Sequence, residues 1–385
     1  MDKIIDKILQ EMELDEANDD LGIDREILSQ IKLSKNYVTT IQGVRRCGKS
    51  ILLKQIIEAK KIHQQAIYVN FEDPRFSDIL DYKLLDQIVE YQELKSKKNL
   101  FYFFDEIQNV QGWEKWLHIQ LAKKKRTFVI SGSNSKLLSG ELGSKLTGRH
   151  LTYELFPFSF FEFKNFTAKN LSDYLNLGGF PLALMMEDHR HLLRDYFVDI
   201  IERDVRSHVA TRSTRTLTQL CKCLFESTGS EISLRNLAKT FDSTADTMKV
   251  YVDALEASYI ILSCPYYTFS ERKSLVRSKK YYPVDLGLRD AVVTKTGLDK
   301  GKKIETIVFH HLRKKAFQVY YWKGKKEVDF VIETAQGVTP IQVSWGEKLS
   351  RHEEAYQEFK KEYPKCNELL FINENNVLDF LKNFE

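Results

Sequence analysis

The residues with the clearest chemistry lie in one short stretch, which reads Gly43-Val44-Arg45-Arg46-Cys47-Gly48-Lys49-Ser50. Its spacing is G-x-x-x-x-G-K-S. It follows the β-rich stretch 37–41 and precedes an apolar helical run that starts at Ile51. A strand, a glycine-bearing loop and a helix in this order are typical of a P-loop, which binds the phosphates of a nucleotide.

The chemistry of the loop predicts a role for each of its parts. Gly43 and Gly48 let the backbone curl so that successive N–H groups can point at phosphate oxygens. The helix that follows adds the positive end of its dipole. We expect Lys49 to hold the β- and γ-phosphates and the Ser50 hydroxyl to bind Mg²⁺. The predicted nucleotide-binding residues are Gly43, Val44, Arg45, Arg46, Cys47, Gly48, Lys49, Ser50 and Ile51. The alternative, a chance match in a turn, is disfavoured by the flanking strand and helix.

An acidic pair forms the second motif. Asp105 and Glu106 follow the apolar run 100–104, which suits a parallel strand buried on both faces. Two carboxylates at such a place are costly unless they meet a cation or water. We expect Asp105 to bind Mg²⁺, usually through water, and Glu106 to orient and polarise an attacking water. The alternative is a strand that ends in an acidic turn, and the P-loop upstream argues against it.

Three further stretches leave alternatives open. Asn134 or Ser133, which follow the apolar run 127–130, could sense the γ-phosphate or could belong to an ordinary turn. Arg149 could contact phosphate within the subunit, reach a neighbour's site as an arginine finger, or form a surface salt bridge. Residues 72–75 could face the nucleotide, but the proline at 74 favours a turn.

Size and composition set the broad class. A chain of 385 residues is expected to hold two or three cores, and 43% hydrophobic with 29% charged residues is an ordinary globular composition. Its apolar runs are shorter than a membrane span, and residues 1–6 lack the apolar region of a signal peptide. The five cysteines are scattered. We therefore expect a cytoplasmic protein with reduced thiols and no membrane contact.

The net charge of +4 is unevenly distributed, because residues 263–326 carry 16 Lys and Arg against 5 Asp and Glu. This segment could attract the phosphate backbone of DNA, or it could be a solvated surface. Residues 231–262 predict a helix-turn-helix. Its second helix offers Lys249 among Asp242, Asp246 and Asp253, so a packing role is favoured over base readout.

Taken together, the motifs resemble a family of bacterial and archaeal AAA+-like ATPases that couple a P-loop core to a C-terminal domain of unknown function. The matching stretches are 43–50, 104–106, 131–134, 148–149, 157–160, 178–181, 282–287 and 327–330. The resemblance covers nearly the whole chain. The resemblance implies an ATPase module, a helical lid, a winged-helix-like segment and a nuclease-like C-terminal fold, and it implies no particular substrate.

The C-terminal domain departs from a working nuclease. Glu305 in a predicted helix and Asp329 in a predicted strand resemble the acids of PD-(D/E)XK nucleases, which gather around Mg²⁺. Where that pattern needs an acid and a lysine, this chain has Gln342 and Ser344. Loss of both groups should remove most of the metal affinity and transition-state stabilisation. We expect a nuclease-like scaffold that does not cleave.

The sequence thus predicts an α/β protein with a parallel-sheet P-loop core. The expected domains are residues 1–165 (ATPase core with N-terminal helices), 166–225 (helical lid), 226–265 (winged-helix-like segment) and 266–385 (degenerate nuclease-like domain). The expected function is Mg²⁺-dependent ATP hydrolysis in a homo-oligomer whose C-terminal half engages DNA or a protein. The alternatives are a nucleotide-switched binding module with slow hydrolysis and, less favoured, an ATP-dependent nuclease.

Overall fold

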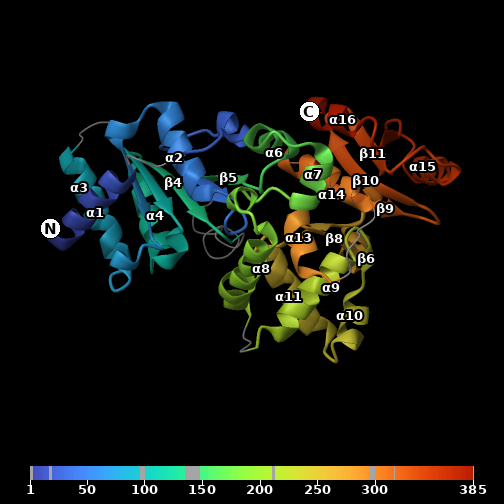
Figure 1. The fold of residues 1–385 in the computed structure, drawn as a ribbon, viewed down its shortest axis with the longest axis horizontal. Helices are drawn as coiled ribbons and strands as arrows, with labels where there is room; N and C mark the ends of the chain where they lie inside the picture. Colours follow the sequence, from blue (N-terminus) through green and yellow to red (C-terminus); the bar gives the residue numbers. More distant parts are fainter. Residues whose placement is uncertain are drawn as a thin grey trace. The chain divides into compact units, whose positions relative to one another are not determined.

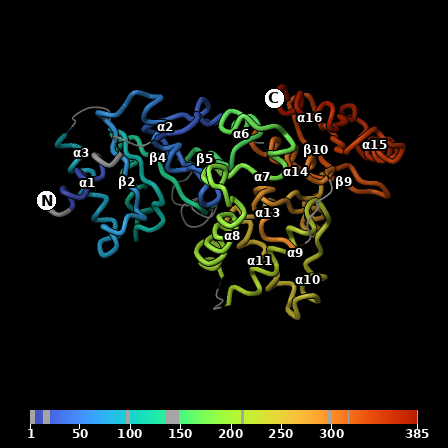
Figure 2. Tube along the Cα trace, viewed as in Figure 1, coloured from blue at the N-terminus to red at the C-terminus, as the bar shows by residue number. Residues whose placement is uncertain are grey.

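The computed structural model describes residues 3–16, 20–95, 100–134, 148–209, 213–294, 300–315 and 317–384. The chain forms two compact units, Met1–Ala168 and Lys169–Glu385. Each is described by itself. Figure 1 labels their helices and strands, and Figure 2 follows the chain from one end to the other.

The first unit is built on a five-stranded parallel sheet in the order β2-β3-β4-β1-β5. The strands are β1 (Val38–Gln42), β2 (Ala66–Asn70), β3 (Phe101–Asp105), β4 (Thr127–Gly132) and β5 (His150–Glu154). The helices are α1 (Lys3–Glu16), α2 (Lys49–Lys60), α3 (Tyr82–Lys95), α4 (Trp113–Lys123) and α6 (Phe160–Thr167). The predicted parallel-sheet core is confirmed.

Two layers of helices enclose this sheet (Figure 1). Side chains of α1, α3 and α4 pack on one face around Phe104 and Phe128, both fully buried. Helix α2 packs across β2, β3 and β4 with Leu52, Leu53 and Ile56 buried. Burial of the central strands on both faces explains why β3 and β4 read as continuous apolar runs.

An N-terminal arginine joins the phosphate loop to the end of the unit. The Arg25 guanidinium donates to both carboxylate oxygens of Glu162, at 2.9 and 3.3 Å, and to the backbone carbonyls of Cys47 (2.9 Å) and Phe156 (2.7 Å). Glu162 in turn accepts from the Ser159 N–H in the capping box of α6. Both charged side chains are buried, so each depends on the other for compensation.

The second unit carries two smaller sheets. One has the order β6-β8-β7 and is antiparallel, and the other has the order β12-β11-β10-β9. The strands are β6 (Glu231–Ile232), β7 (Ile261–Cys264), β8 (Lys279–Pro283), β9 (Val319–Lys323), β10 (Glu327–Thr334), β11 (Gly337–Val343) and β12 (Leu370–Ile372). Helix α14 packs on β9 and β11, and α15 packs on β10. The predicted C-terminal α/β fold is confirmed.

Helices make up the rest of this unit. They are α7 (Leu171–Leu177), α8 (His189–Asp199), a π-helix (Ile200–Val205), α9 (Arg215–Glu226), α10 (Leu234–Thr240), α11 (Ala245–Ala257), α12 (Glu271–Val276), α13 (Leu286–Val292), α14 (Lys300–Lys314), α15 (Ser350–Glu362) and α16 (Val377–Asn383). Ser233 and Thr244 cap α10 and α11 through their side chains. The further division of this unit into lid, winged-helix-like and nuclease-like domains stays a prediction.

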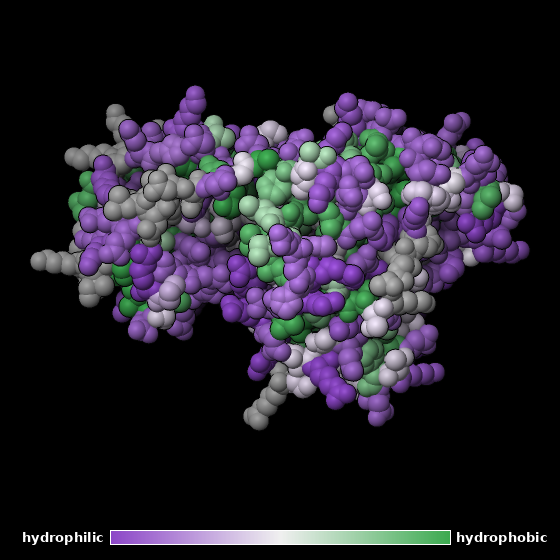
Figure 3. Space-filling view, in the orientation of Figure 1, coloured by the Kyte–Doolittle hydropathy of each residue, from purple (hydrophilic) through white to green (hydrophobic). Residues whose placement is uncertain are grey.

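Hydrophilic side chains cover most of the face shown in Figure 3, with apolar patches among them. Among the described residues, no helix is long and apolar enough to cross a membrane.

The Arg25–Glu162 pair gives the first prediction. Arg25→Met should lower the free energy of unfolding of the first unit by about 3 kcal/mol or more, because it leaves a buried carboxylate unpaired. Arg75→Met is the matched control, since Arg75 pairs with Asp73 near the surface and its loss should cost under about 1 kcal/mol. Urea denaturation read out by hydrogen exchange at β1 and β4 measures both. Equal losses in the two variants would contradict the prediction.

Candidate functional site

The phosphate loop connects β1 to α2 at the carboxyl edge of the parallel sheet. Gly48 has φ +101°, a left-handed conformation that favours glycine. A Cβ on Gly43 would lie 2.1 Å from the carbonyl oxygen of Leu155, so only glycine fits against the end of β5 there. The loop is thus folded tightly at both of its glycines, as a backbone cradle for phosphate requires.

Lys49 lies under this loop and is buried. Its ammonium contacts the carbonyl oxygens of Gly43 (3.2 Å) and Val44 (3.4 Å) and lies 3.3 Å from Glu106 Oε1. Burial lowers the pKa of Lys49, but Glu106 and then other neighbours outweigh it, so the pKa lies above its usual value. The lysine is therefore a permanent cation within the loop.

Asp105 and Glu106 meet the loop from the end of β3. Tyr68 donates to Asp105 Oδ2 at 2.7 Å, and the Ser131 hydroxyl bonds to Asp105 Oδ1. Burial, followed by the charge of Glu106, raises the pKa of Asp105, while hydrogen bonds from Ser131, Ser50 and Tyr68 oppose that rise. Burial makes the ionised form of Asp105 unfavourable, and a bound cation would stabilise that form.

The pKa of Glu106 is shifted in the opposite direction from that of Asp105. Its backbone is left-handed (φ 52°), and Gln108 donates to Oε2 at 2.5 Å. Burial alone would raise the pKa of Glu106, but Lys49, Gln108 and Arg45 outweigh it, and the pKa lies below its usual value. Glu106 is thus ionised at neutral pH, as a base for water must be.

The hydroxyl of Ser50 belongs to the same cluster, because it hydrogen-bonds to Asp105. A hydroxyl and a carboxylate side by side are oxygen donors of the kind that Mg²⁺ prefers. The residues present therefore fit Mg²⁺ together with a triphosphate. The Cys47 thiol is buried and donates to Leu155 O at 3.4 Å, and burial raises its pKa, so only its backbone is suited to phosphate.

Asn134 follows the carboxyl end of β4, which lies in the sheet between β1 and β3. The phosphate loop and the acidic pair follow those two neighbours. Because carboxyl ends of parallel strands share one edge, Ser133 and Asn134 lie between the two motifs, and Asn134 is half-buried there. A role in contacting phosphate stays a prediction.

Arg149 lies elsewhere. Its carbonyl accepts from the N–H of Val38, and His150 pairs with Val38 at the start of the parallel strands β1 and β5. The phosphate loop follows the other end of β1, about 16 Å away at 3.3 Å per residue. The prediction that Arg149 contacts phosphate within its own subunit is therefore wrong, because the strand separates it from the loop.

Several contacts were not predicted from the sequence. Glu72 binds Arg45 of the phosphate loop at 2.7 Å, whereas Asp73 caps the predicted turn. Tyr68 and Ser131 hold Asp105 from the two strands that flank β3. Their positions follow from the sheet register, but the strand order must be known first. No local pattern marks Arg25, which lies in an irregular segment.

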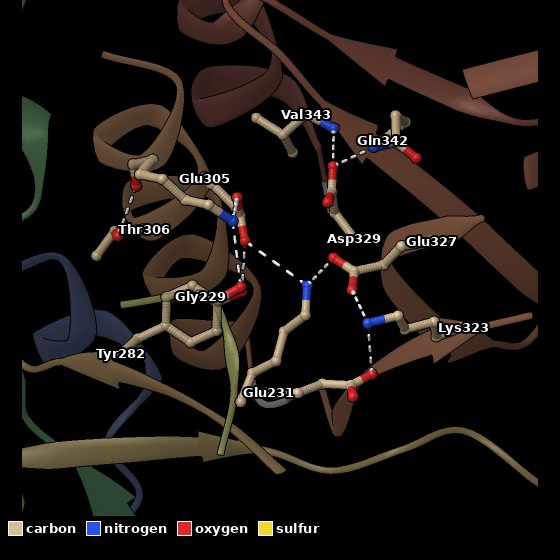
Figure 4. A network of polar contacts seen from close by, with 12 residues as sticks. Gly229, Glu231, Tyr282, Glu305, Thr306, Lys323, Glu327, Asp329, Gln342 and Val343 are labelled. Carbon is tan, nitrogen blue, oxygen red and sulfur yellow. Dashed lines mark hydrogen bonds and ion pairs between the residues drawn. The ribbon is translucent and has the colours of Figure 1, made fainter. Parts of the chain in front are cut away.

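The C-terminal acids lie in a second cluster, drawn in Figure 4. Asp329 accepts from Gln342 Nε2 at 2.5 Å and from the Val343 N–H at 2.8 Å. Glu305 accepts from Tyr282 at 2.7 Å and from Lys302 at 2.7 Å. The structure thus brings together Glu305, Asp329 and Gln342, as the nuclease resemblance implies. Among the residues that the structure describes, no group of three His, Cys, Asp or Glu is arranged to hold a metal.

The fold and the site define the class of protein: the first unit is a P-loop domain of the AAA type. Residues 35–164 match the family described as an AAA domain. Residues 168–300 and 300–383 match two domains of unknown function, DUF8612 and DUF4143. The nuclease-like character of the C-terminal domain therefore stays a prediction.

Whole-chain relatives give the family. The uncharacterized protein MJ1544 of Methanocaldococcus jannaschii is 33% identical over 339 residues, which cover 80% of this chain and 75% of that protein. The chain belongs to the family of MJ1544. An uncharacterized protein of Haemophilus influenzae is 29% identical over 343 residues, covering 83% of this chain and 85% of that protein.

Solved structures show weaker likenesses. The chain is similar to Cdc6p of Pyrobaculum aerophilum, with 11% identity, a TM-score of 0.28, and coverage of 66% of this chain and 86% of that one. It is also similar to AMPPCP-bound DnaA of Aquifex aeolicus, with 15% identity, a TM-score of 0.30, and coverage of 60% and 85%.

Asp329 gives a prediction for pH. Burial, with Glu305 adding to it, raises the pKa of Asp329 to about 7, against about 3.9 in an unfolded chain. The folded protein therefore binds the proton more tightly, and this carboxyl's contribution to stability is lost as pH rises through that window. Asp329→Asn lacks the titration, so its melting temperature should exceed that of the wild type at pH 8 and match it more closely at pH 5. A constant difference at both pH values would contradict this.

Proposed function

We propose that this protein binds ATP with Mg²⁺ at the carboxyl edge of the first unit's sheet and hydrolyses it. The observation that carries the proposal is the cluster of Lys49, Asp105 and Glu106, whose charges are buried together under a phosphate loop. Buried ionisable side chains with shifted pKa values, close to one another, are typical of catalytic and binding sites.

The roles of the side chains follow from their surroundings. When ATP binds, the Lys49 ammonium breaks its ion pair with Glu106 and binds the β- and γ-phosphate oxygens instead. Glu106, freed from the lysine and kept in place by Gln108, orients the attacking water and takes its proton. Ser50 and Asp105 would hold Mg²⁺, which when bound neutralises charge on the phosphates. Asn134 is proposed to contact the γ-phosphate from between the two motifs.

Substitution of Glu106 tests the reaction. Glu106→Gln should retain ATP binding but lower kcat by about 10² to 10⁴, because the base is lost while its shape is kept. Lys49→Ala should lose ATP binding. Arg75→Met, which touches neither motif, serves as the control. ATP binding and phosphate release are measured for each variant. Hydrolysis by Glu106→Gln at the wild-type rate would show that Glu106 is not the base.

One feature favours the slower, switch-like alternative. The Lys49–Glu106 ion pair engages the lysine and the base at once, so both must be released before turnover. If ATP mainly sets a conformation, turnover stays very low and DNA does not stimulate it. Phosphate release with and without double-stranded DNA separates this alternative from the ATPase.

We also propose that the protein works as a homo-oligomer and that its C-terminal half engages DNA or a protein. The position of Arg149 supports the first part, because a side chain at the opposite edge of the sheet lies too far from its own phosphate loop and would have to act at another subunit's site if it contacts phosphate. Exposed cations support the second, among them Arg272, Lys273, Lys325 and Lys326.

A mixing experiment tests the shared site. Arg149→Ala keeps its phosphate loop but lacks the arginine, and Lys49→Ala keeps the arginine but lacks a working loop. Each alone should be nearly inactive, and a mixture should recover activity because mixed oligomers contain complete sites. Full activity of Arg149→Ala alone, or no recovery on mixing, would contradict a role for Arg149 across subunits.

A further inference from the structure

A buried lysine lies within the acidic cluster of the second unit. Lys280, on β8, has no exposed surface. Its ammonium lies 2.5 Å from Glu327 Oε1 and 3.9 Å from Glu305 Oε1, and 5.2 Å from the centroid of the Tyr321 ring. Burial lowers the pKa of Lys280, but Glu305, Glu327 and Asp329 outweigh it and raise the pKa above its usual value. The lysine is therefore charged throughout the physiological range of pH.

The same carboxylates line a pocket. Glu305, Glu327 and Asp329 belong to the wall of a cavity of about 360 Å³, together with Gln342 and Lys302. Figure 4 shows Glu305, Asp329 and Glu327 facing one space from α14 and β10. Glu305 and Asp329 are buried and Glu327 is partly buried, so these carboxylates need positive charge nearby to compensate for their lost hydration.

The pocket also holds an oxygen that has no partner. Gln342 donates its amide N–H to Asp329, and its own Oε1 is buried without a hydrogen bond in the structure. An amide oxygen beside carboxylates is a donor that hard divalent cations accept readily. The cluster thus offers oxygen atoms of the kind that a cation binds, although the described carboxylates are not arranged around a metal. The Lys280 ammonium already lies beside two of them.

We propose that the buried Lys280 ammonium, beside the carboxylates of this pocket, takes the place of a divalent ion among Glu305, Glu327 and Asp329. The lysine comes from β8, in a different sheet from the acids on β10, and so links the two sheets by charge. The carboxylates need no divalent metal because the chain supplies the positive charge. Removal of Lys280 opens a divalent-cation site. This inference does not depend on the proposed ATPase.

The test compares three full-length proteins by the loss of free Mn²⁺ signal in electron paramagnetic resonance. The wild type and Lys280→Arg keep a cation in the pocket and should bind equal amounts of Mn²⁺. Lys280→Met is similar in length but uncharged, and it should bind one additional Mn²⁺ per chain that neither of the other two proteins binds. The nucleotide site is the same in all three, so the difference reports on the pocket.

Two further comparisons fix the location of the ion. Lys280→Met/Glu305→Gln should lose the additional Mn²⁺, and Mn²⁺ should raise the melting temperature of Lys280→Met but not of Lys280→Arg. A folded Lys280→Met that gains no Mn²⁺ would overturn the proposal.

A third comparison holds even if Lys280→Met does not fold. Glu305→Gln in the presence of Lys280 should bind as much Mn²⁺ as the wild type, because the pocket contains no divalent ion to lose. A wild-type protein that gives up one Mn²⁺ on this substitution would overturn the proposal, and unchanged binding supports it.

Discussion

The ion pair between Lys49 and Glu106 is the interaction on which the rest of the site depends. Both side chains are almost fully buried, and neither charge would be tolerated there alone. The pair persists because the loop carbonyls of Gly43 and Val44 contact the ammonium and Gln108 contacts the carboxylate. A triphosphate brings negative charge that can replace Glu106 as the lysine's partner. Binding of the triphosphate and release of Glu106 from the lysine are then one event.

The sheet order brings this pair together at the edge where the phosphate loop leaves the sheet. The strand of the phosphate loop and the strand of the acidic pair are separated by β4, so the two motifs face each other across one strand width. Parallel strands bring their carboxyl ends to one edge, where the loops that leave the sheet can place polar groups side by side. Arg25 completes the frame, since it binds the loop at Cys47 and the end of the unit at Phe156 and Glu162.

Local patterns were sufficient to predict much of this. The glycine and lysine spacing of the loop, the apolar run before Asp105 and the small polar residues after β4 each have a local physical cause, and the structure brings all three to one edge. Contacts over long sequence distances could not be predicted in the same way. Tyr68 reaches Asp105 only because β2 and β3 pair in register, and Arg25 reaches Glu162 across 137 residues. The prediction that Arg149 contacts phosphate in its own subunit failed for a related reason. A single motif does not show at which edge of the sheet its residues lie.

In the second unit, the number of Lys and Arg residues overstated the positive charge of the surface. The excess of Lys and Arg in residues 263–326 suggested a basic surface, yet Lys280 and Lys303 are buried in ion pairs, with Glu327 and Asp290 respectively. A count of residues cannot distinguish a solvated lysine from one that neutralises a buried acid. Part of the positive charge therefore serves the interior, and the exposed remainder is available to a partner.

Calorimetric titration of the full-length protein with ATP in the presence of Mg²⁺ tests the central claim most directly. We expect saturable binding of one ATP per chain, which is weakened when Mg²⁺ is chelated and absent when Asp105 and Lys49 are both replaced by alanine. Heat of binding that is unchanged by that double substitution, or the absence of binding at saturating ATP, would contradict it.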